Sequence, residues 1–165
     1  MIKIAICDDQ KEYLDTAKNL ITQYGAEKDV PFDITEFSNP SDLLDETVEY
    51  DIYLLDVCMP GITGMSLATE LRAKRIESPI VFLTSYSDYA VQAFGVNATH
   101  YIVKPYTKEE FFNGVDKALT AININSPKTI KLKIEGGYKT ILVYNIVWSE
   151  SNDHYQIISL LNGEK

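Results

Sequence analysis

Cysteine and histidine are scarce in this sequence of 165 residues, which has two of each. Two cysteines, Cys7 and Cys58, are too few for a disulfide framework, so we expect a reducing, cytoplasmic environment. The absence of paired Cys/His clusters argues against a structural zinc site. No apolar run approaches the roughly 18 residues that span a bilayer. Aspartates at positions 8 and 9 also interrupt the first apolar stretch too early for a signal peptide.

Positive charge is also in short supply. The chain has 15 Lys+Arg against 24 Asp+Glu, a formal net charge of −9. Residues 1–125 carry 10 basic and 20 acidic side chains, whereas residues 126–165 carry 5 and 4. The long N-terminal part is therefore not expected to bind nucleic acid through a basic face.

Strand-like and helix-like patterns alternate through the first 120 residues. Short β-rich runs predict strands at 2–7, 32–37, 52–55, 79–83 and 100–103. Helical spacing of apolar residues and capping signals predict helices at 11–25, from 38 onward, near 65–75, at 87–95 and at 108–121. Gly25 is expected to end the first helix. Five βα units with short connections predict an α/β fold with a doubly wound parallel sheet.

The pattern changes after residue 121. Residues 122–128 are polar and contain Pro127, as expected of a linker. β-rich runs follow at 129–134, 140–148 and 155–161, with Asn162-Gly163 as a hairpin-turn signal and no helical pattern. We therefore predict a domain at 1–121, a linker at 122–128 and a short all-β segment at 129–165.

Polar side chains stand at the carboxyl ends of four predicted strands. Asp8 and Asp9 follow the first, Asp56 the third, Thr84 the fourth and Lys104 the fifth. In such a sheet the ligand site lies at the carboxyl ends of the strands, so we expect these side chains at one edge. If the first and third strands are neighbours, the carboxylates start about 5 Å apart and repel each other. A hard divalent cation relieves this repulsion, and oxygen-only ligands favour Mg²⁺.

These groups suit phosphoryl transfer to Asp56, because a carboxylate is a competent nucleophile for a phosphoryl group. Mg²⁺ and Lys104, whose long stem can cross the intervening strand, would offset charge on the transferring oxygens. The Thr84 hydroxyl could donate a hydrogen bond to one of those oxygens.

Residues 1–121 resemble the receiver domains of two-component response regulators. The resemblance rests on four features taken together: Asp8-Asp9, Asp56 within Asp-Val-Cys-Met-Pro-Gly, Thr84-Ser85, and Tyr-Ile-Val-Lys-Pro at 101–105. It implies a flavodoxin-like five-stranded sheet of order 2-1-3-4-5 and a cis bond between Lys104 and Pro105.

The resemblance also implies a role for each candidate residue. Asp56 would accept a phosphoryl group from a sensor histidine kinase, and Thr84 and Lys104 would bind that group. Tyr101 would be the aromatic switch residue. The face formed by helix 87–95, strand 100–103 and helix 108–121 would then change its affinity for partners, with a homodimer as the readout. The implied Mg²⁺ ligands are Asp9 and Asp56 directly, Asp8 through water, and the backbone carbonyl of Cys58.

Two segments resemble the LytTR (LytR/AlgR) class in particular. Residues 84–94 resemble receivers of that class, and residues 139–157 resemble the opening strands of a LytTR DNA-binding domain. Only residues 129–165 are available to form that domain, so we expect a truncated one and little specific DNA binding by this chain. The resemblance implies that the intact parent regulates transcription.

Other interpretations remain open at this point. The same groups could serve a Mg²⁺-dependent aspartyl-phosphate phosphatase acting on an external substrate, although Cys58 stands where an acid/base residue would help. A flavodoxin-like nucleotide binder is disfavoured, because a phosphate loop after the first strand needs glycines and not carboxylates. Tyr101 could be a core tyrosine, and Cys7 and Cys58 could have a redox role. His154 could contact DNA in a complete LytTR domain.

Overall fold

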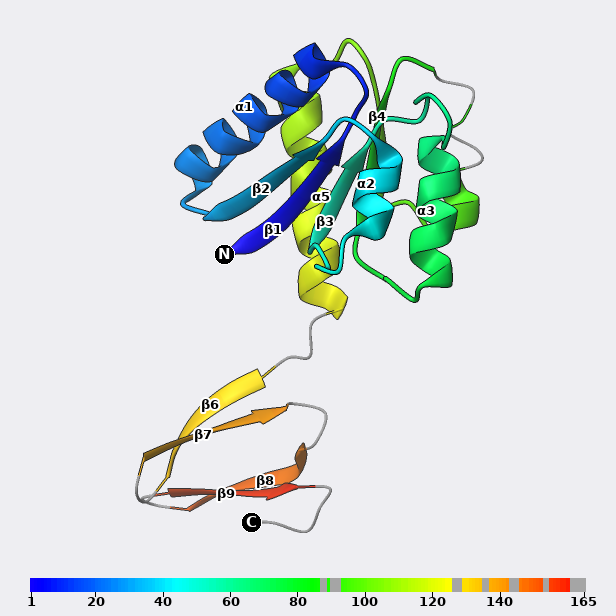
Figure 1. Cartoon of the computed structure of the whole chain (residues 1–165). Helices are drawn as coiled ribbons and strands as arrows, with labels where there is room; N and C mark the ends of the chain where they lie inside the picture. The colour runs from blue at the N-terminus through cyan, green and yellow to red at the C-terminus, as the bar shows by residue number, and fades with distance from the viewer. Residues whose placement is uncertain are drawn as a thin grey trace. The chain divides into compact units, whose positions relative to one another are not determined.

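The computed structural model describes residues 1–86, 89, 93–125, 129–134, 137–142, 146–152 and 155–160. The chain forms two compact units, Met1–Asn123 and Ile124–Lys165 (Figure 1). Within the described part, no helix has the length and apolar character needed to cross a membrane.

The first unit is built on a five-stranded parallel sheet in the order β2-β1-β3-β4-β5. This confirms the predicted doubly wound architecture and the strand order that the resemblance implied. Every residue of β3 and β4 is buried, which explains why both strands are continuously apolar in sequence. The strands are β1 (Ile2–Cys7), β2 (Phe32–Phe37), β3 (Ile52–Leu55), β4 (Ile80–Thr84) and β5 (His100–Val103).

Helices cover both faces of this sheet. The structure has α1 (Lys11–Lys28), α2 (Pro40–Asp45), α3 (Gly64–Ala73), the short 3-10 helix η1 (Phe94–Val96) and α5 (Lys108–Asn125). Alternate strand residues such as Ile4, Ile52 and Val81 pack with α1 and α5, whereas Ala5, Tyr53 and Phe82 pack with α2 and α3. Most of the expected helix at 87–95 lies outside the described residues.

Two helix ends differ from the prediction. Helix α1 does not stop at Gly25 but continues to Lys28, and Asp29 ends it in the left-handed conformation with φ 55°. Gly25 is instead needed for close approach, because a Cβ there would lie 2.8 Å from the backbone oxygen of Val30. Helix α5 continues to Asn125, so residues 122–125 of the expected linker are helical.

The second unit consists of two antiparallel strand pairs. Strand β6 (Thr129–Ile134) pairs with β7 (Gly137–Leu142), and β8 (Ile146–Asn152) pairs with β9 (Tyr155–Leu160). The β-rich run at 140–148 holds the end of β7 and the start of β8. His154 and the Asn162-Gly163 turn lie outside the described residues.

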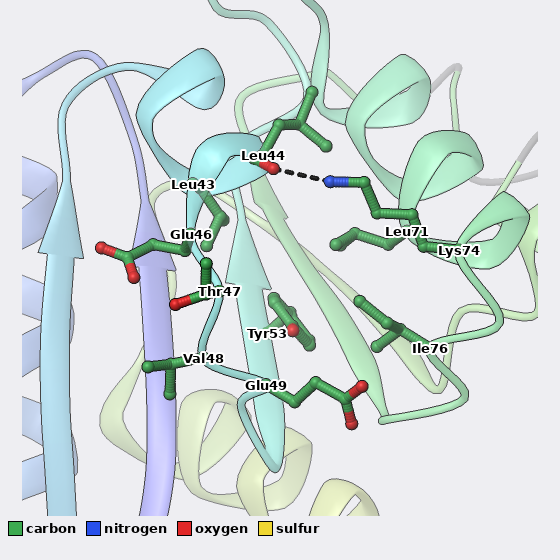
Figure 2. Close-up of a pocket in the computed structure, with 10 residues that line it drawn as sticks. All are labelled: Leu43, Leu44, Glu46, Thr47, Val48, Glu49, Tyr53, Leu71, Lys74 and Ile76. Atoms are coloured by element: carbon green, nitrogen blue, oxygen red, sulfur yellow. Dashed lines mark hydrogen bonds between the residues drawn. The ribbon is translucent and has the colours of Figure 1, made fainter.

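A hollow opens between α2 and α3 beside the amino end of β3 (Figure 2). Leu43, Leu71 and Tyr53 line it. The side chain of Lys74, the residue directly after α3, donates a hydrogen bond of 2.6 Å to the carbonyl of Leu44. Because Asp56 follows the opposite end of β3, this hollow is separate from the polar edge of the sheet.

Candidate functional site

Two aspartates meet where neighbouring strands end. Asp8 directly follows β1 and Asp56 directly follows β3, and the two strands pair in register up to Cys7 and Leu55. The backbone N–H of Asp56 donates to the carbonyl of Cys7 at 2.8 Å. Both aspartates are almost completely buried, at 3% and 4% exposure. Parallel pairing therefore forces two carboxylates into one small, dry space.

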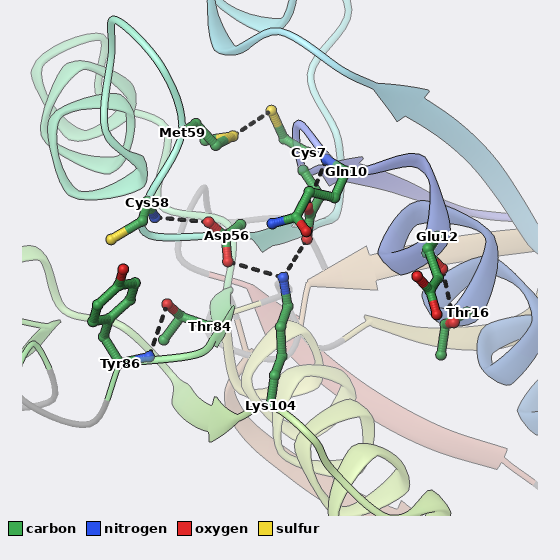
Figure 3. Close-up of polar contacts among 11 residues, drawn as sticks. Cys7, Gln10, Glu12, Thr16, Asp56, Cys58, Met59, Thr84, Tyr86 and Lys104 are labelled. Atoms are coloured by element: carbon green, nitrogen blue, oxygen red, sulfur yellow. Dashed lines mark hydrogen bonds and ion pairs between the residues drawn. The ribbon is translucent and has the colours of Figure 1, made fainter.

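Lys104 joins this pair from two strands away. Its backbone follows β5, and its stem crosses β4 so that Nζ lies 2.9 Å from Oδ1 of Asp56 (Figure 3). The same Nζ lies 2.5 Å from Oδ2 of Asp8. The lysine side chain is 2% exposed. One ammonium therefore serves two carboxylates, and the group of three retains one excess negative charge.

The remaining carboxylate oxygens bind backbone amides. Oδ1 of Asp8 accepts from the N–H of Gln10 at 3.0 Å, and Oδ2 of Asp56 accepts from the N–H of Cys58 at 2.7 Å. Burial raises the pKa of Asp56 above its ordinary value, and the hydrogen bond and charge of Lys104 only partly oppose this. The carboxylate that is expected to react is thus desolvated and fixed in orientation.

The other expected site residues lie at the same edge in different environments. Thr84 is the last residue of β4, fully buried, and its Oγ1 accepts a 3.4 Å hydrogen bond from the N–H of Tyr86. Asp9 is exposed next to Asp8. Over the residues that the structure describes, no three His, Cys, Asp or Glu side chains form a group that could hold a metal ion. Asp8, Asp9 and Asp56, which the sequence analysis expected close together, therefore do not form one group of three carboxylates in this structure.

Tyr101 lies on β5 and reaches toward the segment after β4. Its hydroxyl donates a hydrogen bond to the backbone carbonyl of Tyr86, and its ring centre lies 6.2 Å from that of Phe82. The side chain is half-buried, so it is neither a plain core residue nor a free surface group.

Cys7 and Cys58 flank the aspartates, and both thiols have raised pKa values. Burial is the larger cause for Cys7, with the charges of Asp8 and Asp56 adding to it, and its pKa rises to about 12. The Cys7 thiol donates to the sulfur of Met59 at 3.6 Å. A thiol held protonated in this way is a poor nucleophile, which argues against the redox interpretation.

Sequence reasoning missed one contact at the site. The ring of Tyr13, in the first turns of α1, lies against the Lys104 ammonium at 3.8 Å from ring centre to Nζ. In sequence, Tyr13 is one of several residues on the apolar face of that helix. Nothing in the helical spacing distinguishes a tyrosine that faces the sheet edge from one that only packs in the core.

The family model for the response regulator receiver domain matches residues 4–116, more than half of the chain. The chain belongs to the response regulator receiver family. The Lys104-Pro105 bond of this receiver is cis, as the resemblance implied.

Curated relatives of this receiver include regulators named LytT and LytR. The sensory transduction protein LytT of Oceanobacillus iheyensis is 31% identical over 149 residues, covering 86% of this chain and 59% of that protein. The transcriptional regulatory protein LytR of Staphylococcus aureus is 31% identical over 133 residues, 78% of this chain and 52% of that protein. The chain spans about half the length of the curated relatives it matches.

Solved receiver structures share the fold. The response regulatory domain of protein mrkE from Klebsiella pneumoniae is 27% identical with a TM-score of 0.68, covering 75% of this chain and all of that one. The response regulator TrrA of Thermotoga maritima, solved in complex with Mg(2+)-BeF, is 29% identical with a TM-score of 0.63 over 72% of this chain and 99% of that one.

Proposed function

We propose that Asp56 of this receiver accepts a phosphoryl group from the phosphohistidine of a sensor histidine kinase, in a reaction that requires Mg²⁺. A carboxylate oxygen bonds to phosphorus while the P–N bond breaks, which gives an acyl phosphate, and the imidazole nitrogen takes a proton from solvent. The observation that carries the proposal is the buried contact between Asp56 and Lys104, shared with Asp8.

Lys104 is in place for charge neutralisation before any donor arrives. Its ammonium already touches Oδ1 of Asp56, so transferred phosphoryl oxygens would meet a positive charge without a large movement of the lysine. The hydroxyl of Thr84 stands at the end of the next strand, where it can donate to one of those oxygens. Fixed groups of this kind lower the barrier because they need no reorganisation during the reaction.

The donors at this edge fit a hard divalent cation. Asp8 and Asp56 offer carboxylate oxygens, which Mg²⁺ prefers, and they carry one negative charge more than Lys104 neutralises. We place the backbone carbonyl of Cys58 and the exposed Asp9, which follows Asp8 directly, with them as further ligands. Asp9 would have to turn toward the other two carboxylates, because the three do not form one group among the described residues. Bound there, the ion would offset negative charge on the phosphoryl oxygens. The TrrA complex with Mg(2+)-BeF supports this assignment by analogy.

The same proposal makes Tyr101 the reporter of phosphorylation. Its hydroxyl donates a hydrogen bond to the carbonyl of Tyr86, two residues after Thr84. A shift of Thr84 toward a phosphoryl group would therefore move the acceptor that holds Tyr101. Strand β5 and helix α5 would carry this change to the surface, where a homodimer forms. The parent protein would bind DNA through a complete LytTR domain, as expected of a relative of LytT and LytR.

The phosphatase alternative gains no support from these comparisons, since the family and the named relatives are signalling and regulatory proteins. The acceptor is tested by incubating the chain with acetyl phosphate and Mg²⁺ and measuring intact mass. We expect one added phosphoryl group, sensitive to hydroxylamine and prevented by a chelator. Asp56→Asn should abolish the addition, whereas Asp33→Asn, the same change at an exposed position on β2, should not. Equal labelling of Asp56→Asn would show that Asp56 is not the acceptor.

A further inference from the structure

An aromatic ring completes the enclosure of the Lys104 ammonium. The Nζ atom contacts Oδ2 of Asp8, Oδ1 of Asp56 and the ring of Tyr13, whose centre is 3.8 Å away. With 2% of the lysine side chain exposed, these three groups replace most of the water around the charge. Tyr13 comes from α1, whereas Asp8 and Asp56 directly follow β1 and β3.

The ring and the carboxylates hold the ammonium in different ways. A carboxylate attracts it through directed hydrogen bonds, which must break when a phosphoryl oxygen takes their place. A ring face attracts a cation through its quadrupole, an interaction that gains strength where water is excluded and does not require one N–H direction. The ring can therefore keep Nζ at the sheet edge while its hydrogen-bond partners change.

We infer that Tyr13 is a positioning residue for Lys104 in phosphoryl transfer, acting through its ring face. The inference rests on the proposed function, because it assigns Tyr13 to the same reaction. It predicts that the aromatic ring is required and that apolar volume alone does not suffice. Tyr13→Phe and Tyr13→Trp keep a ring face, whereas Tyr13→Leu keeps only an apolar side chain.

The kinetic arm measures the rate of Asp56 phosphorylation by acetyl phosphate over a range of donor concentrations. We expect Tyr13→Leu to lower the saturating rate about tenfold, in line with the loss of a desolvated cation–π contact. Tyr13→Phe and Tyr13→Trp should stay close to the wild type. Tyr138→Leu, which changes an exposed tyrosine on β7, is the matched control and should have no effect. A wild-type rate for Tyr13→Leu, or an equal loss in Tyr13→Phe, overturns the inference.

A spectroscopic arm separates this inference from the proposed function. The ring current of Tyr13 should shift the NMR signals of the Lys104 ε-methylene upfield, in Asp56→Asn as well as in the wild type. The shift should persist in Tyr13→Phe and vanish in Tyr13→Leu. If the wild type is never phosphorylated, the proposed function fails while this shift remains. If the shift is absent from a folded wild-type protein, the ring contact itself is disproved.

Discussion

Removing the shared ammonium should destabilise the receiver more than removing any exposed lysine. Oδ2 of Asp8 and Oδ1 of Asp56 lie 2.5 and 2.9 Å from the same nitrogen, so they are at most about 5.4 Å apart. At an effective dielectric constant of about 20, two like charges at that separation repel by roughly 3 kcal/mol. Lys104→Met leaves this repulsion unopposed, and breaking a buried ion pair typically costs about 3–5 kcal/mol.

We therefore expect Lys104→Met to lower the free energy of unfolding by about 3 kcal/mol at neutral pH without divalent cations. The measurement is urea denaturation followed by far-UV circular dichroism. Lys11→Met is the control, because the Lys11 side chain is 71% exposed and its ion pairs contribute little. Added Mg²⁺ should restore part of the loss, since a ligand of the folded state stabilises it by mass action.

A double variant tests the origin of the effect. Lys104→Met combined with Asp56→Asn removes the second charge along with the first, so it should recover most of the lost stability. The two substitutions should thus be strongly coupled, as expected for residues in direct contact. If Lys104→Met unfolds at the wild-type urea concentration, or if Asp56→Asn rescues nothing, the electrostatic account of this edge is wrong.

Three further predictions concern stability. Because burial raises the pKa of Asp56, the folded chain holds the carboxyl proton more tightly than the unfolded chain does. The thermal stability of Asp56→Asn should therefore match that of the wild type near pH 4 and exceed it as the pH rises to 7. The opposite trend in thermal denaturation would refute this. The Tyr106 hydroxyl is buried without a hydrogen-bond partner among the described residues. Tyr106→Phe should therefore raise the free energy of unfolding by about 1 kcal/mol, as measured by urea denaturation. Gly25→Ala should destabilise by about 1–2 kcal/mol, despite the better helix propensity of alanine, because the new Cβ meets the Val30 oxygen; a more stable variant would disprove the close approach.

Much of this architecture could be predicted from the sequence. The apolar runs of β3 and β4 and the alternating β and α patterns define a parallel sheet, and the polar residues after its strands must then share an edge. That rule brings Asp8 and Asp56 together once β1 and β3 are neighbours, an order that the family resemblance implied and the structure confirms. The rule works because strand pairing fixes the backbone positions, and these can be predicted without knowing the side-chain rotamers.

What the sequence could not provide depends on three-dimensional packing. Helical spacing places Tyr13 on the apolar face of α1, yet only the path of the Lys104 side chain makes it a cation partner. Glycine is typical of a helix C-terminus, but Gly25 lies within α1 and is needed there because the Val30 backbone approaches closely. Similarly, Asp9 follows Asp8 in sequence, yet Asp9 is exposed whereas Asp8 is buried.

The proposed function requires that the Asp56 carboxylate becomes an acyl phosphate. Borohydride reduction of the chain after incubation with acetyl phosphate and Mg²⁺ converts a phosphorylated aspartate to homoserine, and peptide mass spectrometry locates it. We predict homoserine at position 56 alone, and none when Mg²⁺ is chelated. Homoserine at position 8 or 9, or at no position while the chain is folded and Mg²⁺ is present, would contradict the account.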